Sequence, residues 1–322
     1  MNTPILTVNQ LQVCFTKESE EITVVNGISF HVHAGETLGI VGESGCGKSI
    51  TSLSIMRLIP SPPGRIASGQ IVYNNRDLTQ LSEEEMSDVR GNEISMIFQE
   101  PMTSLNPVFT IGRQIDEIIQ LHTSASKQEA KEQSIEMLKR VGISRAEQIY
   151  HSYPFELSGG MRQRVMIAIG MACQPKLLIA DEPTTALDVT IQLQILDLMK
   201  KLQANENTAI MLITHDLGVV AEMCDRVLVM YAGEIVEEAD VDDLFHDPKH
   251  PYTIGLPRSI PSSAEKKRRL YSIKGQVPPA GTKTKGCRFA ERCDRVIDRC
   301  WKESPESVSV GKNHTCRCWL HA

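Results

Sequence analysis

The strongest chemical signal in the sequence is a short glycine-rich stretch, GESGCGKS, that ends in a lysine and a serine. It fits the pattern G-x-x-x-x-G-K-S/T, with a strand-like apolar run before it and a helix-like pattern after it. The glycines let backbone N–H groups converge on a polyphosphate at the positive N-terminus of a helix. Lys48 is placed to hold the β- and γ-phosphates, and the Ser49 hydroxyl is placed to bind Mg²⁺. A chance glycine-rich turn would not need these flanks, so the sequence predicts a nucleoside triphosphate site. Its residues are Gly42, Glu43, Ser44, Gly45, Cys46, Gly47, Lys48 and Ser49.

Two carboxylates close a second apolar run, 177–180, which reads as a buried strand. Asp181 can serve Mg²⁺, and Glu182 can orient or deprotonate a water. Paired acids at a strand end also occur by accident, but downstream of a phosphate loop in a parallel sheet they favour catalysis. His215 follows another strand-like run, 210–214. A lone histidine usually has a structural explanation, but this strand-end position favours a role at the γ-phosphate.

A second anion site is predicted around LSGGMRQR, residues 157–164. Ser158 fits the N-cap position of the helix that follows. That helix would begin with exposed backbone N–H groups, which attract anions.

The cysteines are unevenly distributed, because five of the nine fall within the last 36 residues. In a reducing compartment such a cluster suggests metal binding before disulfides. The five are Cys287, Cys293, Cys300, Cys316 and Cys318.

Composition narrows the class of protein. A length of 322 residues predicts about two domains, and 41% hydrophobic with 23% charged residues is ordinary for a soluble globular chain. The net charge of −6 argues against nucleic acid as the main partner.

The N-terminus has no signal-peptide pattern, and no run approaches the roughly 18 apolar residues of a membrane span. We therefore expect a protein inside the cell, soluble or peripheral to a membrane. The basic run Lys266–Arg269 fits a solvated linker better than a site for lipid or RNA.

The remaining chain predicts an α/β fold with a helical insertion. Alternation over 5–15 and 28–32 predicts paired strands, and 94–98 reads as a buried strand that ends before Gln99. Phe15 could stack on an adenine ring, although such an aromatic is more often part of a core. Residues from about 100 to 172 show helical spacing, and capping boxes open two predicted helices, at Ser82–Glu85 and Ser126–Glu129.

In order, the motifs GESGCGKS, FQEP, LSGGMRQR, LLIADEP, TTALD and LITHD resemble those of the ATP-binding cassette (ABC) ATPases over residues 5–245. The LSGGMRQR stretch separates that family from other phosphate-loop proteins. The resemblance implies an α/β fold with a RecA-like core, an N-terminal antiparallel β subdomain and a helical insertion at about 100–172. These parts form a nucleotide-binding domain over 1–245, and a small cysteine-rich extension follows over 246–322. The implied activity is hydrolysis of ATP to ADP and phosphate with Mg²⁺.

The resemblance also assigns roles. Lys48 and Ser49 would be the Walker A contacts, Asp181 the Walker B ligand of Mg²⁺, and Glu182 the catalytic glutamate. The other implied roles are Gln99 as the glutamine that senses Mg²⁺ and the attacking water, Ser158, Gly159 and Gly160 as the signature that contacts a partner's nucleotide, Asp188 as the D-loop aspartate, His215 as the switch histidine and Phe15 as the A-loop aromatic.

In the family, two cassettes enclose two ATP molecules, each between one Walker A motif and the other cassette's signature. This chain has one copy of each motif, so the resemblance implies a dimer with a sister ATPase or with itself. FQEPMTSLNP (98–107), TTALDVTIQ (184–192), HPYT (250–253) and the cysteine tail resemble the ATP-binding subunits of dipeptide, oligopeptide and nickel importers. The implied partners are two integral-membrane permease subunits served by an external substrate-binding protein, at the cytoplasmic face of the cell membrane, with no nucleic acid.

Peptide import is the leading expectation, and import of nickel or a metal chelate is the alternative within the family. A soluble ABC ATPase of translation or DNA repair would carry tandem cassettes or a long coiled-coil insertion, and the sequence shows neither. A third alternative is that the cysteine tail is a redox sensor and that the ATPase is subordinate to it. Pro257 stands where the family usually has leucine, and we expect it to break a helix.

Cys287, Cys293 and Cys300 resemble the importer pattern that carries a 4Fe–4S cluster, for which thiolates are the ligands. Spacing alone does not favour a cluster over a four-cysteine zinc site, and unligated thiols are a further alternative. The family ending matches Cys318 as the fourth ligand, with Cys316 as the alternative.

Overall fold

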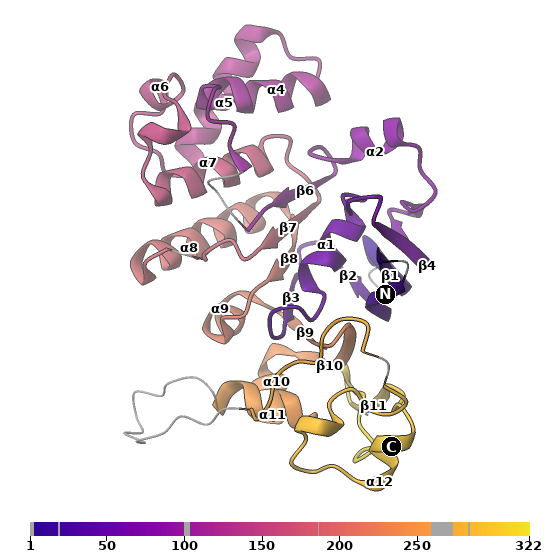
Figure 1. Ribbon diagram of the computed structural model, residues 1–322. Helices are drawn as coiled ribbons and strands as arrows, with labels where there is room; N and C mark the ends of the chain where they lie inside the picture. Colours follow the sequence, from indigo (N-terminus) through magenta and orange to yellow (C-terminus); the bar gives the residue numbers. More distant parts are fainter. Residues whose placement is uncertain (1–2, 19, 100–103, 186, 259–272, 283) are drawn as a thin grey trace. The chain divides into compact units, whose positions relative to one another are not determined.

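The computed structural model describes residues 3–18, 20–99, 104–185, 187–258, 273–282 and 284–322 (Figure 1). Two compact units emerge: Met1–Thr3, Val32–Thr37 and Gln80–Ile213 form the first, and Pro4–His31, Leu38–Thr79 and Thr214–Ala322 form the second. The basic run at 266–269 lies outside the described residues. The domain boundary after residue 245 stays a prediction.

Parallel strands form the core of the first unit: β6 (Ile94–Ile97), β7 (Leu177–Asp181) and β8 (Ala209–Ile213), with β7 in the middle. Every residue of β7 and β8 is buried, which explains their unbroken apolar runs. Asp181 pairs with Ile213, so residues that follow these strands meet at one edge of the sheet.

The predicted helical insertion lies in this first unit. Its helices α4 (Ile111–His122), α5 (Lys127–Arg140) and α7 (Gly159–Met171) pack against one another. Ser126 and Glu129 form the capping box predicted for α5, and the box predicted at Ser82 opens α2. The unit also contains α2 (Glu83–Val89), α6 (Ala146–Ile149), η1 (Pro154–Glu156) and α8 (Val189–Glu206).

The second unit begins with an antiparallel sheet in the order β2-β1-β4-β5. The strand predicted over 5–15 continues to Lys17, because the Thr16 N–H still donates to the Pro63 carbonyl oxygen at 3.0 Å. The strands are β1 (Leu6–Lys17), β2 (Glu20–Val32), β4 (Gly64–Tyr73) and β5 (Arg76–Asp77).

A further set of strands in the second unit has the order β11-β12-β10-β9-β3. β3 (Thr37–Val41) and β9 (Arg226–Tyr231) are parallel and wholly buried. Antiparallel strands β10 (Glu234–Asp240), β12 (His314–Cys316) and β11 (Val308–Gly311) extend this set. Helices of the unit are α1 (Lys48–Ile55), α9 (Leu217–Met223), α10 (Val241–His246), α11 (Pro251–Arg258), η2 (Ala290–Arg292) and α12 (Asp298–Lys302).

The α/β fold with antiparallel and parallel strands and a helical insertion is therefore confirmed. The break expected at Pro257 does not occur, since α11 continues through it to Arg258. Pro257 lies one residue before the end of the helix, where its missing N–H affects only the last turn.

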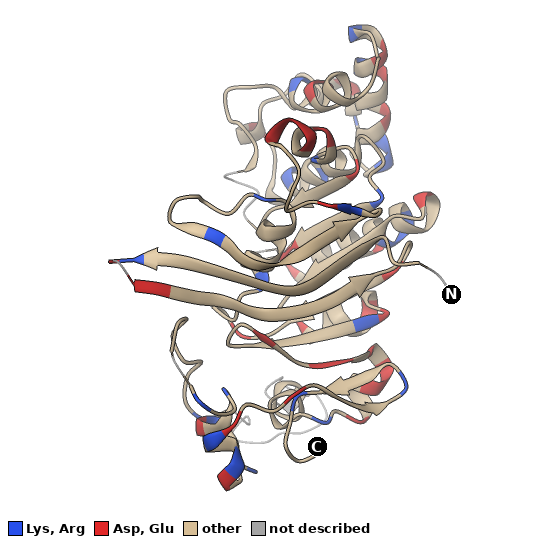
Figure 2. Cartoon of the chain, turned by 90° about the vertical axis from the view of Figure 1, so that its right-hand side faces the viewer, with Lys and Arg blue, Asp and Glu red and all other residues tan. Residues whose placement is uncertain are grey.

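In the described parts of the chain, lysine and arginine positions are interspersed with aspartate and glutamate positions (Figure 2). Among the described residues, no helix combines the length and apolar character that crossing a membrane requires.

Candidate functional site

The phosphate loop connects β3 to α1, as the sequence predicts. Gly42 has φ 154°, and a Cβ there would lie 2.2 Å from the Met230 carbonyl oxygen. Gly47 has φ 105°, a left-handed conformation that glycine adopts without strain. Because both positions exclude a side chain, the loop can bring its backbone N–H groups close to a ligand.

Lys48 is the first residue of α1 and is 6% exposed. Its Nζ donates to the carbonyl oxygens of Gly42 at 2.7 Å and Glu43 at 3.2 Å, so the ammonium lies over the loop. Ser44 and Gly45 form the exposed part of the loop, while Ser49 is half-buried one residue further into α1. Burial raises the pKa of the Cys46 thiol, which keeps it in its neutral form.

Glu43 is held by two residues that sequence reasoning missed. Its backbone N–H donates to the Tyr252 hydroxyl oxygen at 2.9 Å, and its carboxylate is paired with the Arg292 guanidinium. Tyr252 stands in the HPYT stretch and Arg292 precedes Cys293, but no local pattern shows that either reaches the loop.

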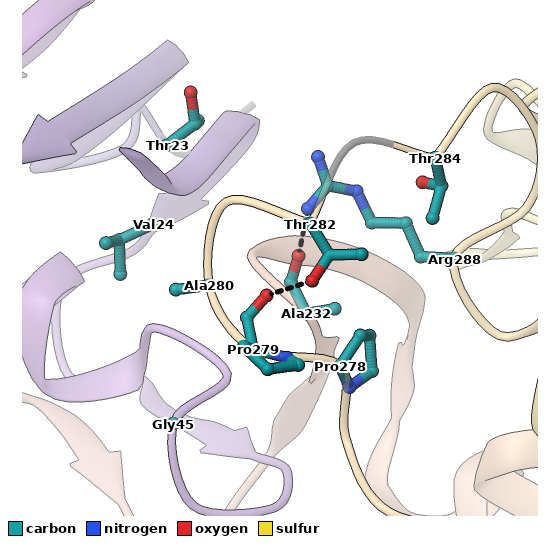
Figure 3. A pocket seen from close by; sticks show the side chains of 10 residues that line it. All are labelled: Thr23, Val24, Gly45, Ala232, Pro278, Pro279, Ala280, Thr282, Thr284 and Arg288. Carbon is teal, nitrogen blue, oxygen red and sulfur yellow. Dashed lines mark hydrogen bonds between the residues drawn. The ribbon is translucent and has the colours of Figure 1, made fainter. Parts of the chain in front are cut away.

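The C-terminal segment, residues 273–282 and 284–322, also lies beside the loop at Gly45 (Figure 3). A cavity of about 10 Å³, room for about one water, is lined by Gly45, Ala232, Pro279, Ala280 and Arg288 among others. Arg288 donates to the Ala232 carbonyl oxygen at 2.5 Å, which fixes this segment to the turn after β9.

Predicted catalytic residues of the first unit gather at the carboxyl ends of β6 and β7. The Glu182 carboxylate accepts hydrogen bonds from Gln99 Nε2 at 3.0 Å and from Thr185 Oγ1 at 2.8 Å, both at Oε2. Asp181 is buried at the end of β7. Glu182 has φ 48°, a left-handed conformation that is costly for a non-glycine residue and is concentrated at functional sites. Thr185 was not among the predicted site residues.

The predicted signature begins α7 and lies next to the start of α8. Ser158 caps α7 by accepting the Met161 N–H at 3.4 Å, and Asp188 caps α8 by accepting the Ile191 N–H at 3.0 Å. A Cβ on Gly160 would lie 2.9 Å from Ile191 Cγ2, so the two helix starts are close-packed. Ser158 and Gly159 are exposed, with open space where a Gly159 side chain would stand.

The other two predicted nucleotide contacts belong to the second unit. His215 is exposed and lies two residues after β8 ends at Ile213. Phe15 is half-buried on β1 and pairs with Gly64.

The C-terminal cysteines approach one another without forming a preformed ligand set. Burial raises the pKa of Cys287 to about 11, and the charges of Cys300, Cys318 and Cys293 add to this shift. Cys316 donates a hydrogen bond to Cys318, which lowers the pKa of Cys318. Over the described parts of the chain, no three His, Cys, Asp or Glu residues are arranged to hold a metal ion.

Comparison with known families decides the identity of this arrangement. Residues 25–185 match the ABC transporter family. The chain belongs to that family. Residues 236–300 match the oligopeptide/dipeptide transporter C-terminal region.

Relatives of this ABC ATPase span nearly its whole length. The oligopeptide transport ATP-binding protein AppD of Bacillus subtilis (strain 168) is 56% identical, over 98% of this chain and 97% of that protein. The dipeptide transport ATP-binding protein DppD of the same organism is 46% identical, over 98% of this chain and 94% of that protein.

A solved ABC structure, the dimeric cassette MJ0796 in a post-hydrolysis state bound to ADP and Pi, aligns with a TM-score of 0.66 at 26% identity. The alignment covers 73% of this chain and 98% of that one. The predicted family and ATPase fold are thus confirmed.

Proposed function

We propose that this ABC ATPase is the ATP-hydrolysing subunit of an importer of dipeptides or oligopeptides. The observation that best supports hydrolysis is the hydrogen bond between Gln99 and Glu182. Glu182 adopts a left-handed conformation directly after Asp181. The peptide cargo is supported by full-length relatives named for oligopeptide and dipeptide transport, and by the match of residues 236–300.

ATP binding is assigned to the loop from Gly42 to Ser49. Its backbone N–H groups and the N-terminus of α1 would hold the phosphates, and Lys48 would move its Nζ from loop carbonyls to the β- and γ-phosphates. Phe15 would stack on the adenine ring.

Hydrolysis is assigned to the carboxylate of Glu182, which would accept the proton of an attacking water. Gln99 and Thr185 fix the direction of that carboxylate through their hydrogen bonds. The oxygen donors of Ser49 and Asp181 suit Mg²⁺, which when bound would neutralise developing phosphate charge. His215 would contact the γ-phosphate, as its exposed position after β8 permits.

Exposed apolar side chains near the signature support dimerisation. Val189 is 73% and Leu193 is 50% exposed, and their i,i+4 spacing puts both on one face of α8. Exposed apolar side chains on one helix face suit coverage by another protein surface. We assign that surface to a second cassette, either a sister ATPase or another copy, whose ATP would be contacted by Ser158, Gly159 and Gly160.

Coupling to the membrane is assigned to the helical part of the first unit. A groove of about 670 Å³ runs over α4, lined by Thr110, Arg113 and Tyr150 among others. Two residues before Thr110, Val108 is 70% exposed, and Arg113 stacks on the Phe109 ring at 3.9 Å. A helix at the cytoplasmic end of a permease subunit would fill this groove. Two permease subunits served by an external binding protein would keep the chain at the cytoplasmic face of the cell membrane.

The cysteine segment is proposed to bind a 4Fe–4S cluster, with a structural zinc ion as the alternative. Thiolates are the ligands that either group needs. The thiols of Cys287, Cys293, Cys300 and Cys318 influence one another electrostatically, although among the described residues no three are arranged to hold a metal ion. Cys316 instead hydrogen-bonds Cys318, which supports Cys318 as the fourth ligand.

Anaerobic purification tests the cysteine proposal by colour, iron and acid-labile sulfide. Cys318→Ser should lose the colour, and Cys316→Ser should keep it. Colourless protein with one zinc per chain would replace the cluster by a zinc site, and the opposite pattern of variants would make Cys316 the ligand.

Transport tests the whole proposal. The chain is reconstituted with its permease subunits and binding protein in proteoliposomes, and uptake of a labelled dipeptide and a labelled pentapeptide is compared with uptake of a nickel chelate. Peptide uptake that requires ATP and is lost in Glu182→Gln is expected. ATP-driven uptake of the nickel chelate alone would replace the peptide by a metal complex.

A further inference from the structure

An ion pair connects the phosphate loop to the C-terminal segment. The Glu43 carboxylate accepts from both terminal nitrogens of Arg292, with Nη1 to Oε1 at 3.0 Å and Nη2 to Oε2 at 3.2 Å. A two-point pair of this kind fixes direction as well as distance. Glu43 is the second residue of the loop, so the pair acts on backbone assigned to ATP.

The guanidinium of Arg292 is itself fixed on several sides. Its Nε donates to the Lys274 carbonyl oxygen at 2.8 Å, and it lies 5.6 Å from the Tyr231 ring centroid and 6.0 Å from that of Phe289. The side chain is only 5% exposed. A planar group with this set of contacts is held in position before it meets the carboxylate, which a lysine could not reproduce.

Tyr252 holds the backbone of the same loop residue. Its hydroxyl accepts the Glu43 N–H at 2.9 Å, and its buried ring packs edge-on against Tyr231 with centroids 4.8 Å apart. The Tyr252 ring also packs against Phe289 at 5.5 Å. The aromatic cluster thus supports both groups that hold Glu43.

We propose that Arg292 is a positioning residue for ATP binding, which acts through Glu43 and makes the C-terminal segment part of the nucleotide site. The proposal rests on the proposed function, because it requires the loop to bind ATP. Near a polyphosphate, an unpaired Glu43 carboxylate would repel the ligand and could turn across the loop. Paired with Arg292, that carboxylate has its charge compensated and its direction fixed.

A second contact supports this coupling independently of charge. Pro279 and Ala280 line the small cavity beside Gly45, and the Thr282 hydroxyl donates to the Pro279 carbonyl oxygen at 2.6 Å (Figure 3). The C-terminal segment therefore borders the loop at Gly45 as well as at Glu43.

The test measures the Kd for a fluorescent ATP analogue and the KM and kcat for ATP, using the full chain. Arg292→Gln should raise Kd and KM roughly tenfold, since coupled neighbours of this kind commonly interact by that amount. The value of kcat at saturating ATP should change little, because the variant leaves Glu182 and Gln99 untouched. Arg292→Lys should recover part of the affinity.

Three further variants separate positioning from simple loss of stability. Glu43→Gln/Arg292→Gln should bind ATP as well as Glu43→Gln alone, because with a neutral residue 43 there is no charge for Arg292 to hold. Arg226→Gln is the matched control: Arg226 is also buried, with its side chain 8% exposed, pairs with Glu238 and donates to the His31 carbonyl oxygen at 2.6 Å. It should lower the melting temperature and leave the Kd for ATP within twofold of wild type.

The outcomes of these measurements distinguish the positioning role of Arg292 from the proposed function. Wild-type affinity in Arg292→Gln, additive effects in the double variant, or an equal loss of affinity in Arg226→Gln would overturn the positioning role while leaving the proposed function intact. A wild-type chain that binds no ATP would overturn the proposed function, and this inference with it.

Discussion

At the scale of single residues, catalysis depends on the carboxylate of Glu182. In Glu182→Gln an amide can still hold a water, but it cannot accept the water's proton. We expect ATP affinity to remain and turnover to fall on the order of 10²-fold or more. Phosphate release at saturating ATP, with nucleotide binding measured separately, checks this expectation.

Two comparisons make the result specific to that carboxylate. Thr185→Val removes one hydrogen bond to Glu182 and should cost less, because it disturbs only the direction of the carboxylate. Glu132→Gln removes an exposed acid on α5 and should have no effect on turnover. If Glu182→Gln hydrolyses ATP within a few-fold of wild type, another group is the base.

At the scale of elements, the features that could be predicted are those encoded by residues close together in the sequence. The capping box at Ser126 and Glu129 and the buried strand before Asp181 are local signals, and the structure contains both. Gln99 and Glu182 were predicted separately, and their contact follows from two parallel strands that end at one edge. Arg292 could not be predicted, because its approach to Glu43 joins residues 249 positions apart through an aromatic cluster.

The segment that leads into α11 makes stability depend on pH. His250 is buried, and its Nδ1 accepts the Tyr252 backbone N–H at 3.1 Å. The backbone N–H of His250 donates to Glu237 Oε2 at 2.8 Å. Burial lowers the pKa of His250 to about 3, with the charge of His321 adding to the shift. The unfolded chain, with a histidine pKa of about 6.5, therefore binds more protons than the folded chain between these values.

The free energy of unfolding should thus fall as the pH drops below about 6.5, by up to about 1.4 kcal/mol per pH unit from this group. Above that pH its contribution is constant. His250→Asn keeps an acceptor but does not titrate, so its stability should fall less steeply in urea titrations at pH 7, 6 and 5. Equal slopes for the variant and wild type would exclude His250 as the source.

At the scale of the whole molecule, the chain carries one phosphate loop and one signature, and the proposal pairs each with the opposite motif of a second cassette. Substitutions of Lys48 and Ser158 should then differ in their effect on ATP binding by the substituted chain. Lys48→Ala removes the charge that holds the phosphates, so it should weaken ATP binding by this chain itself. Ser158→Arg places a long side chain in the open space before Gly159 and should leave that binding intact.

Ser158→Arg should instead impair hydrolysis of the ATP that the partner chain binds. We expect this variant to bind ATP within a few-fold of wild type as an isolated chain, yet to lose most ATPase activity in the assembled dimer. Mixing it with the Lys48→Ala chain distinguishes the two arrangements, if the functional dimer contains two copies of this chain. Across the dimer, one composite site then combines an intact loop with an intact signature and should regain part of the activity, whereas sites confined to single chains would regain none. Equal loss of ATP affinity in the two isolated variants would place the signature in its own chain's binding site and contradict the two-chain arrangement.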